Sequence, residues 1–412
     1  IVSCPYFNLI PFHACALYQM LKAAYSLRGY EALLLDYTDA LFIFDEIHAY
    51  DPKRLALIIE TIAWLREHFH ARFMVMTATL PPMVREKLEQ ALPDHDVIEA
   101  DSSLYKASQR HRVHLRDGDM LEDLQHILAD VLDGQSVLIC CNQVSRAQTV
   151  YKFFREHLGA GKITLLHGRF NGKDRNDKEQ QLLEKVGVRS DKRVRPYVVV
   201  ATQAVEVSLD IDLDTLYTDP APLEALLQRF GRVNRGRSTQ EICPVHVYRE
   251  PSMETMPYEP KLIQASLAEL EQIDGCNIDE AQVTAMLEHI YQGEIRANWL
   301  AEYDRQVVDF KRFVLDKMQP FTSADLDLHK RFYSMFDGID LLPADCRDDY
   351  DKTLDTVGYL AASQYFVNIS TAQYYRLRGK KYIQDRDIDD NEHMPPTICK
   401  PYSPEYGLEL EE

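Results

Sequence analysis

Short, wholly apolar runs recur along the chain, separated by longer stretches with helical spacing. Six of these runs have strand length and are rich in β-branched or aromatic residues: Leu41–Phe44, Phe73–Met76, Val137–Cys141, Ile163–Leu166, Tyr197–Val200 and Val245–Tyr248. Runs without polar alternation are typical of strands that are buried on both faces. The clearest helical pattern covers Pro52–Phe69, where Asp51 is placed to cap the first turn. This alternation of strand and helix predicts an α/β fold with parallel sheets.

A change of pattern after Glu250 suggests how the chain is divided. The strand and helix alternation forms two blocks, joined by the polar stretch Asp101–Arg110. Three prolines, Pro251, Pro257 and Pro260, are followed by mainly helical patterns. We therefore predict domains at 1–102 and 103–250, followed by a linker and a helix-rich accessory domain at 251–412.

The charge of the chain limits how it can meet nucleic acid. The formal net charge is −19, and residues 251–412 carry 16 Lys and Arg against 31 Asp and Glu. Any contact with a polyanion therefore needs a local basic surface. No apolar run approaches the roughly 20 residues of a membrane span, and the eight cysteines include no C-x-x-C pair. These features favour a soluble, cytoplasmic protein with reduced thiols.

Two adjacent carboxylates follow the first apolar run, in the string Leu41-Phe-Ile-Phe-Asp45-Glu46-Ile-His48. Asp45 at a strand end can hold Mg²⁺, and Glu46 can orient and deprotonate an attacking water. The alternative is a strand that runs into a helix, with both acids in its first turn. A second string, Thr77-Ala78-Thr79, follows the run Phe73–Met76, and its alternative is a hydroxyl cap on the helix over 82–92.

The strongest signal is the string Gln228-Arg229-Phe-Gly231-Arg232-Val-Asn-Arg235. Its arginines recur every three residues, so that they can converge on a small anion, and Gly231 removes a side chain where close approach is needed. Guanidinium groups suit the charge that develops on a transferring phosphoryl group. A solvated basic face or an ion-pair network is the alternative, but acids that could pair with these arginines are missing nearby in the sequence.

Polar residues also follow three other predicted strands, where open α/β sheets bind ligands. They are Asn142, the turn His167-Gly-Arg169, and the segment Thr202-Gln203 that runs on to Asp210. For the last segment alone, an ordinary polar loop is an alternative reading.

These strings, in this order, resemble the motifs of superfamily 2 helicases, which implies two RecA-like domains. DEIH resembles motif II, the Thr77–Thr79 string motif III, the Thr202–Asp212 segment motif V and QRFGRVNR motif VI. FDEIHAYDP, LLHGRF and ATQAVEVSLDID point to one branch, the CRISPR-associated helicase of type I interference, an antiviral defence system. The resemblance is close over about residues 30–250.

The resemblance implies a role for each matching residue. Asp45 would bind Mg²⁺, and Glu46 would be the hydrolytic base of a DEAH-like box. Gln228, Arg232 and Arg235 would engage the γ-phosphate of ATP, while Asp210, Arg229 and Gly231 would lie at the nucleotide. Coupling between the domains would involve His48, Thr77 and Thr79. The single-stranded DNA track would include Asn142, His167, Arg169, Thr202 and Gln203.

One required part of such a motor is not found in the sequence. A complete ATPase needs a glycine-rich loop with G-K-[ST], and none precedes Asp45. Gly161-Lys162-Ile163 fails because Ile163 has no hydroxyl for Mg²⁺. We expect the first RecA-like domain to be incomplete, with its missing half supplied in the same or another chain, and negligible ATPase activity from this chain alone. A nuclease is not supported by these residues.

The sequence thus predicts the ATP-dependent, single-stranded DNA-translocating motor of a type I CRISPR helicase, which acts with an RNA-guided surveillance complex. A superfamily 2 helicase of DNA repair or remodelling is one alternative, and a non-catalytic binding scaffold is another. Near the end of the chain, Tyr374–Tyr382 interleaves aromatic and basic residues. This segment favours a hairpin with a basic turn at Gly379, although it could also stack on DNA.

Overall fold

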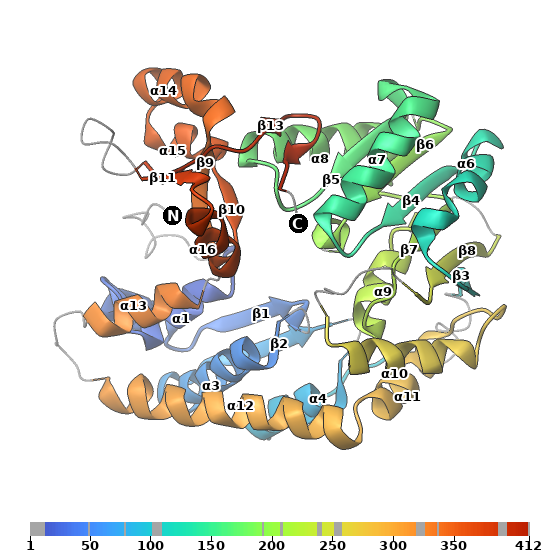
Figure 1. Cartoon of the computed structure of the whole chain (residues 1–412). Helices are drawn as coiled ribbons and strands as arrows, with labels where there is room; N and C mark the ends of the chain where they lie inside the picture. Colours follow the sequence, from blue (N-terminus) through green and yellow to red (C-terminus); the bar gives the residue numbers. More distant parts are fainter. Residues whose placement is uncertain are drawn as a thin grey trace. The chain divides into compact units, whose positions relative to one another are not determined.

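The computed structural model describes residues 13–47, 50–77, 80–100, 109–191, 193–206, 209–236, 241–250, 258–318, 326–335, 338–385 and 394–410. The chain divides into two compact units (Figure 1). Unit 1 combines residues 1–101 with 281–336, and unit 2 combines 102–280 with 337–412. This division differs from the predicted domains, because the residues after 250 are shared between the two units instead of forming one domain.

Unit 1 is built on two parallel strands and a long helical pair. Its elements are α1 (Tyr18–Ala24), α2 (Tyr30–Tyr37), β1 (Leu41–Asp45), α3 (Pro52–Phe69), β2 (Arg72–Met76), α4 (Pro82–Ala91), α11 (Glu280–Ile290), α12 (Gly293–Phe313), η6 (Leu315–Lys317) and α13 (Leu326–Ser334). Helix α3 starts as predicted, because the Asp51 side chain accepts a hydrogen bond from the backbone N–H of Arg54. Tyr303 and Phe310 of α12 are buried in the same core as the apolar face of α3.

The β1–β2 sheet has one covered face and one exposed face. On the covered face, Phe42 stacks on Phe73 with ring centroids 5.2 Å apart. On the other face Leu41 and Ile43 are each 58% exposed, and Met74 and Met76 are 47% and 39% exposed. Parallel sheets are normally covered on both faces. Unit 1 therefore presents an exposed apolar sheet face.

Unit 2 contains a six-stranded parallel sheet in the order β3-β8-β7-β4-β6-β5. Its elements up to residue 271 are β3 (His111–Arg116), η3 (Met120–Glu122), α6 (Leu124–Leu132), β4 (Ser136–Cys140), α7 (Val144–Leu158), η4 (Ala160–Lys162), β5 (Ile163–Leu166), α8 (Gly172–Val186), β6 (Tyr197–Ala201), η5 (Gln203–Val205), β7 (Thr215–Thr218), α9 (Leu223–Phe230), β8 (Cys243–Tyr248) and α10 (Pro260–Glu271). Apolar residues of α6 and α7 share one core with β4, β5 and β6. The carboxyl ends of these parallel strands lie at one edge of the sheet, which is where the polar turns begin.

The remainder of unit 2 forms a smaller α/β part. It comprises β9 (Ile339–Pro343), η7 (Ala344–Cys346), α14 (Arg347–Thr356), α15 (Tyr359–Ala362), η8 (Ser363–Tyr365), β10 (Val367–Ile369), α16 (Thr371–Gly379), β11 (Ile383–Gln384), β12 (Thr397–Ile398), β13 (Tyr402–Ser403) and β14 (Gly407–Leu408). The expected hairpin over Tyr374–Tyr382 is wrong, because most of this segment is helix α16. Ser370 and Gln373 form a capping box that starts this helix.

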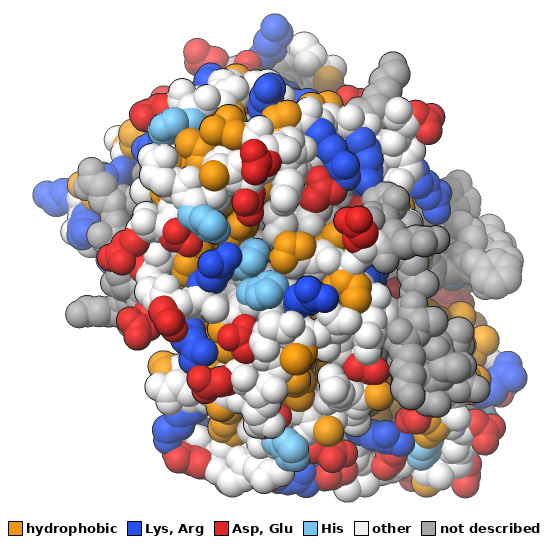
Figure 2. All heavy atoms as spheres, turned by 90° about the vertical axis from the view of Figure 1, so that its right-hand side faces the viewer, with side chains coloured by type: hydrophobic (Ala, Val, Ile, Leu, Met, Phe, Trp, Pro, Cys, Tyr) orange, Lys and Arg blue, Asp and Glu red, His pale blue; other side chains and the backbone are white. Residues whose placement is uncertain are grey.

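The six predicted strands are confirmed by β1, β2, β4, β5, β6 and β8, and the predicted helix over 52–69 is confirmed by α3. Strands β3 and β7 were not predicted. In the described part of the chain, no helix is both long and apolar enough to cross a membrane. Acidic and basic side chains alternate over the face in Figure 2, so its described part carries no continuous stripe of one charge.

Three histidines of unit 2 are buried and hold depressed pKa values. Burial lowers the pKa of His111 to about 4 and the pKa values of His167 and His246 to about 3. The His246 ring stacks on Tyr217 with centroids 4.5 Å apart, so that it is enclosed by the sheet. All three are neutral at pH 7 in the folded protein. The unfolded chain binds more protons below about pH 6.5, and stability must then fall as the pH falls.

We therefore predict that unit 2 loses stability between pH 7 and pH 5, by about 2 kcal/mol for each of these histidines. Urea unfolding followed by hydrogen exchange at the backbone amides of the six-stranded sheet, at the two pH values, measures the loss. A His246→Phe variant should show a shallower pH dependence, because one of the titrating groups is gone. Equal unfolding midpoints at pH 7 and pH 5 in the wild-type chain would contradict the prediction.

Candidate functional site

The predicted acids lie together at the carboxyl edge of the unit 1 sheet. Asp45 is the last residue of β1 and is exposed, and it is in register with Met76, the last residue of β2. The backbone N–H of Glu46 donates to the carbonyl of Met76 over 3.0 Å. Thr77 follows β2 at the same edge and is half-buried. The structure thus brings Asp45, Glu46 and Thr77 to one edge, while His48 and Thr79 lie outside the described residues.

The backbone at Glu46 is strained. Its φ is 55°, a left-handed conformation that residues with a Cβ seldom adopt. Such strain persists where the surrounding structure fixes the residue, and it is concentrated at functional sites. Here the hydrogen bond from the Glu46 N–H to the carbonyl of Met76 holds the turn. An exposed carboxylate at a strand end, like that of Asp45, is an oxygen donor suited to Mg²⁺.

Arg229 is buried inside unit 2. It was predicted to lie at the nucleotide, and its complete burial was not expected there. It is 0% exposed. Its Nε donates to Glu206 over 2.9 Å, and its terminal nitrogens donate to the Thr218 hydroxyl over 2.7 Å and to Asn142 Oδ1 over 3.1 Å. Further bonds reach the carbonyl of Asp219 and the Tyr258 hydroxyl. Because these partners occupy the guanidinium, Arg229 positions the strand ends in this conformation and makes no contact with solvent.

The other two arginines of the string have different environments. Arg232 is 4% exposed and donates to the carbonyls of Val205 and Glu206, over 2.7 and 2.6 Å. It therefore fixes the turn that follows β6. Arg235 lies nearer to solvent and forms an ion pair of 2.8 Å with Asp210. Of the predicted phosphate-binding arginines, Arg235 is the one with an exposed guanidinium.

Two remaining residues of the string lie around the end of α9. Gln228 is half-buried in its last turn. Gly231 follows the helix, where its N–H donates to the carbonyl of Leu227 over 2.9 Å. A Cβ at this position would lie 3.3 Å from the carbonyl oxygen of Gln228. Gly231 therefore allows the chain to turn tightly between Arg229 and Arg232.

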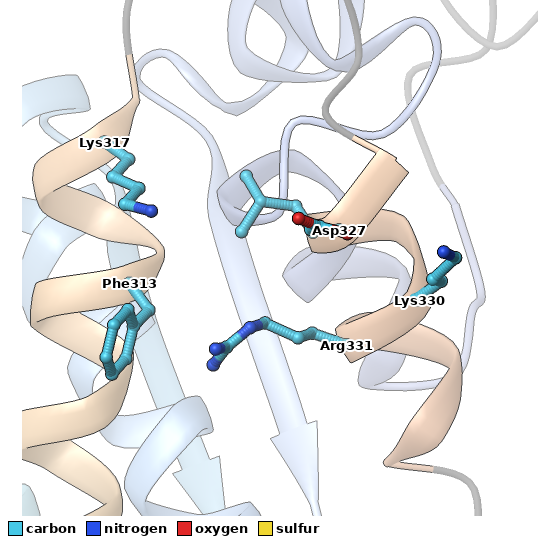
Figure 3. A pocket seen from close by; sticks show the side chains of 6 residues that line it. Phe313, Lys317, Asp327, Lys330 and Arg331 are labelled. Atoms are coloured by element: carbon cyan, nitrogen blue, oxygen red, sulfur yellow. The ribbon is translucent and has the colours of Figure 1, made fainter.

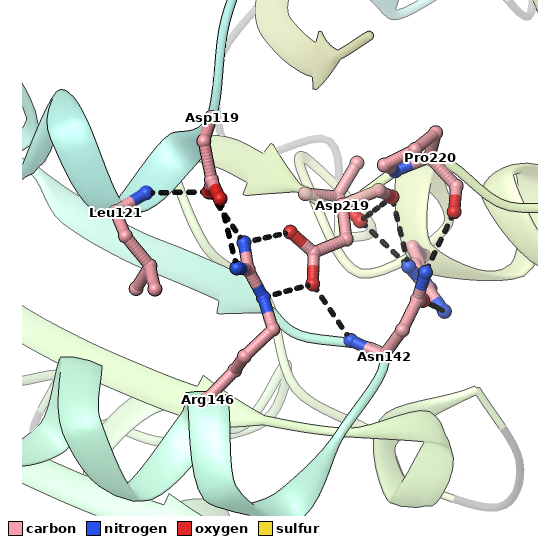
Figure 4. A network of polar contacts seen from close by, with 8 residues as sticks. Asp119, Leu121, Asn142, Arg146, Asp219 and Pro220 are labelled. Atoms are coloured by element: carbon pink, nitrogen blue, oxygen red, sulfur yellow. Dashed lines mark hydrogen bonds and ion pairs between the residues drawn. The ribbon is translucent and has the colours of Figure 1, made fainter. Parts of the chain in front are cut away.

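A second buried arginine adjoins this group and was missed in the sequence. Arg146 of α7 binds Asp119 over 2.7 Å and Asp219 over 2.8 Å, as Figure 4 shows. Asp219 also accepts the backbone N–H of Asn142 over 2.9 Å, and the Asn142 side chain donates to the carbonyl of Pro220. The sequence signal was available, since Asp219 directly follows the short strand TLYT.

The predicted DNA-track residues of unit 2 lie at the same sheet edge but are covered by protein. Their exposures are 5% for Asn142, 0% for His167, 7% for Arg169 and 4% for Thr202. Gln203 is half-buried and donates to the carbonyl of Asn142 over 3.1 Å. In this conformation these side chains contact other protein groups. Direct contact with a single strand of DNA would require the covering segments of the protein to move.

The segment that covers His167 is the hairpin β13–β14. His167 Nδ1 accepts the N–H of Arg169 over 3.1 Å, so that Nε2 of this neutral ring carries the proton and donates to the carbonyl of Tyr406 over 3.0 Å. The N–H of Leu408 donates to the carbonyl of Arg169. At the intervening Gly407, where φ is 70°, a Cβ would lie 2.6 Å from the His167 ring. The hairpin therefore requires glycine here.

Comparisons with known proteins show what this chain is similar to. The family model for the C-terminal part of the CRISPR-associated nuclease/helicase Cas3 matches residues 133–238. The chain is 29% identical over 310 residues to the CRISPR-associated nuclease/helicase Cas3 of Methanothermobacter thermautotrophicus, covering 70% of this chain and 36% of that protein. The chain is therefore similar to the Cas3 nuclease/helicases over the residues that these comparisons cover.

Solved Cas3 structures have the same fold. The ADP complex of T. fusca Cas3 superimposes with a TM-score of 0.70 and 16% identity over 95% of this chain and 56% of that one. A chain of a structure described as "CRISPR RNA-guided surveillance complex, pre-nicking" gives a TM-score of 0.63 and 19% identity, covering 88% and 54%. The present chain thus spans about a third to a half of the length of these Cas3 proteins. Among the described residues, no group of three or more His, Cys, Asp or Glu side chains could hold a metal ion.

We predict that Arg229→Ala destabilises unit 2 by about 3–5 kcal/mol, because it leaves Glu206, Thr218 and Asn142 without the fully buried guanidinium that binds all three. Arg235→Ala is the matched control: it removes the same type of side chain from an exposed pair and should cost about 1 kcal/mol or less. Chemical unfolding measures both. Equal losses for the two variants would show that Arg229 does not hold the strand ends together.

We also predict that Gly407→Ala weakens the docking of the hairpin, with a loss of about 1–3 kcal/mol from strain and steric overlap. Gly275→Ala is the control, since Gly275 has a similar φ of 72° but no atom within 4 Å of an added Cβ. Hydrogen exchange at the Leu408 amide is the measurement. It should accelerate in Gly407→Ala and not in Gly275→Ala, and unchanged exchange in both would contradict the steric argument.

Proposed function

We propose that this chain is the motor part of a type I CRISPR interference helicase, which uses ATP to move along single-stranded DNA and unwind the target. The observation that supports it is the pairing of two features in one chain that is similar to Cas3. Asp45 ends the first strand of one unit and Glu46 follows it, and the exposed Arg235 follows helix α9 of the other. Hydrolysis of a nucleoside triphosphate needs both groups, acids for metal and water and guanidinium for the phosphoryl charge.

In this proposal each residue has a distinct role. The exposed carboxylate of Asp45 holds Mg²⁺, which neutralises phosphate charge when it is bound with ATP. Glu46 orients the attacking water and takes its proton. Arg235 releases Asp210 and binds the γ-phosphate. This change of partner is possible because the ion pair between Arg235 and Asp210 is exposed and therefore weak. Gln228 assists at the phosphate.

Arg232 and Arg229 act indirectly in the proposed mechanism. Arg232 binds the carbonyls of the turn Val205–Glu206, and Arg229 binds Glu206 itself. The turn and the helix therefore move together. We propose that this linkage transmits the state of the nucleotide to the residues after β6, including Thr202 and Gln203, which adjust their hold on the DNA strand.

The exposed face of the β1–β2 sheet supports the expectation that unit 1 acts with a further α/β segment. We propose that this segment covers Leu41, Ile43, Met74 and Met76 and carries the glycine-rich phosphate loop. The apolar area that it would bury supplies the driving force for its association. By analogy with the Cas3-like chain of the pre-nicking surveillance complex, we further propose an RNA-guided complex as the partner that delivers the DNA.

We predict that residues 1–412 alone release phosphate from ATP at a negligible rate, with or without single-stranded DNA, because the β- and γ-phosphates lack their loop. A longer chain that supplies the segment should show DNA-stimulated release. In that longer chain Glu46→Gln should lower the rate by about a hundredfold or more, as the loss of a general base does. Glu67→Gln, a change at an exposed position of α3, is the control and should not alter it.

Two outcomes would contradict the proposal. Rapid DNA-stimulated turnover by residues 1–412 would show that no further segment is needed. Absence of turnover in the longer chain, with DNA binding retained, would favour a non-catalytic scaffold.

A further inference from the structure

The tip of the β13–β14 hairpin lies against side chains of unit 2 that donate hydrogen bonds to it. We call these five residues the donor surface: Gln148, Tyr151 and Arg155 of α7, His167 after β5, and Lys178 of α8. Their acceptors are oxygen atoms of two residues at the tip, Glu405 and Tyr406. Apart from His167, the residues of the donor surface lie outside the strings that resemble helicase motifs.

The carboxylate of Glu405 is bound by two of these donors. The Tyr151 hydroxyl and the Nε of Arg155 reach the same oxygen, over 3.0 and 2.8 Å. Lys178 Nζ donates to the backbone carbonyl of Glu405 over 3.4 Å. One neutral donor and two cations therefore meet at this residue, which contributes one negative charge.

Tyr406 receives the other two bonds of the donor surface. The side-chain amide of Gln148 and Nε2 of His167 donate to its carbonyl over 2.8 and 3.0 Å. Both donor side chains are buried. The N–H of Tyr406 instead donates to the Ser403 hydroxyl over 3.0 Å. The tip thus presents acceptors to the donor surface and keeps this N–H within the hairpin.

An aromatic ring helps to hold one cation of the donor surface. Lys178 Nζ lies 4.5 Å from the ring centroid of Phe170. A similar arrangement occurs in unit 1, where Figure 3 shows Arg331 pointing towards Phe313. A ring attracts a cation through its quadrupole without neutralising it. Burial lowers the pKa of Lys178 to about 8, so that it is mostly protonated at pH 7, and its partly desolvated charge attracts an anion more strongly than in water.

The base of the hairpin is anchored outside the donor surface. Tyr402 and Leu408 are buried in the core of the smaller α/β part of unit 2. The ion pair between Arg155 and Glu405 is partly exposed, by 34% and 41% of the two side chains, and such pairs contribute little to stability. Tyr406 packs against the core of the six-stranded sheet, which favours the docked tip when no ligand competes. A competing anion can therefore displace the tip while the base stays attached.

The donor surface suits a phosphodiester backbone. The oxygens of a phosphodiester accept hydrogen bonds, as do those of Glu405 and Tyr406 that now receive them. An extended peptide would also bring N–H groups, which need acceptors that these five side chains do not supply in their present bonding. A phosphate in the place of the Glu405 carboxylate would receive the bonds of Tyr151 and Arg155. Charge-assisted bonds from a guanidinium are strong with phosphate.

We propose that the donor surface is a binding site for the phosphate backbone of single-stranded DNA, and that Glu405 of the docked hairpin occupies the place of a phosphate. The proposal rests on the proposed function, because it assumes that the chain acts on a DNA strand. Docking of the tip and binding of DNA exclude each other. The apparent DNA affinity is therefore reduced in proportion to the fraction of molecules whose tip is undocked.

The first test compares Glu405→Ala with the wild-type chain of residues 1–412. Fluorescence anisotropy of a labelled oligothymidylate should show an affinity about fivefold higher in the variant, because the internal competitor is lost. Glu179→Ala is the matched control: it removes the same charge from α8, where Glu179 pairs with Arg175. A general electrostatic effect would raise both affinities equally.

The second test removes a donor in the Glu405→Ala background. Arg155→Gln should abolish most of the gain and lower the slope of log affinity against log salt by about 0.7, the value for one phosphate contact of a single strand. Arg175→Gln, in the same background, is its control and should leave the gain in place. An oligodeoxyadenylate should behave like the oligothymidylate, because phosphates are bound and bases are not read.

The third test displaces the hairpin without a change of charge. Gly407→Ala, which weakens docking through its contact with His167, should also raise the DNA affinity. In the wild-type chain, saturating oligothymidylate should accelerate hydrogen exchange at the Leu408 amide, which donates to the carbonyl of Arg169 when the hairpin is docked. Thermal unfolding of each variant verifies that the rest of the fold is intact.

The outcomes separate this inference from the proposed function. Higher affinity in Glu405→Ala and Gly407→Ala than in Glu179→Ala supports the site. DNA binding that is equal in all of these chains overturns the site and leaves the proposed function in place. A labelled polyglutamate that shows the same gain would overturn the assignment to DNA in favour of an acidic peptide. No binding of DNA by any of the chains overturns the site and also counts against action on single-stranded DNA.

Discussion

The buried guanidinium of Arg229 joins four segments that are distant in the sequence. Its partners are Glu206 after β6, Thr218 at the end of β7, Asn142 after β4 and Tyr258 before α10. Burial of a charge is costly unless hydrogen bonds and an opposite charge compensate it. Here both are present, so that the strand ends are held in one arrangement. The positions of the nearby Arg232 and of the turn that it binds depend on this arrangement.

A second network extends this arrangement to the outer helices. Arg146 joins α7 to Asp219 at the end of β7 and to Asp119 before η3, in an environment with little solvent. Asn142 belongs to both networks, since it accepts from Arg229 and donates its backbone N–H to Asp219. A displacement at one strand end is therefore resisted at the others. The two networks therefore hold the strand ends of unit 2 in one rigid arrangement.

The helices and strands that are determined by neighbouring residues were predicted from the sequence. The strands that are apolar throughout and the capped helix α3 were found, because their signal lies within a few residues. Strand β7 was missed, since its sequence TLYT is short and polar, although all four of its residues are buried. The expected hairpin at Tyr374 failed because the Ser370–Gln373 capping box outweighed the aromatic pattern.

In the candidate site, likewise, some positions were predicted from the sequence, whereas the burial of other residues was not. Asp45 and Glu46 were placed at a strand end by their order alone, and the structure has them there. Burial was not predictable for Arg229 and His167, because it comes from residues far along the chain. Arg229 needs Asn142, and His167 needs Tyr406.

The contact between His167 and Tyr406 also constrains the order in which the chain can fold. It joins residues 239 positions apart, and the helices of unit 1 at 281–336 are translated in between. Unit 2 therefore cannot close the turn after β5 when that strand leaves the ribosome. The turn must wait until Tyr406 has been synthesised, and long-range closures of this kind slow folding and leave strand ends exposed in the meantime.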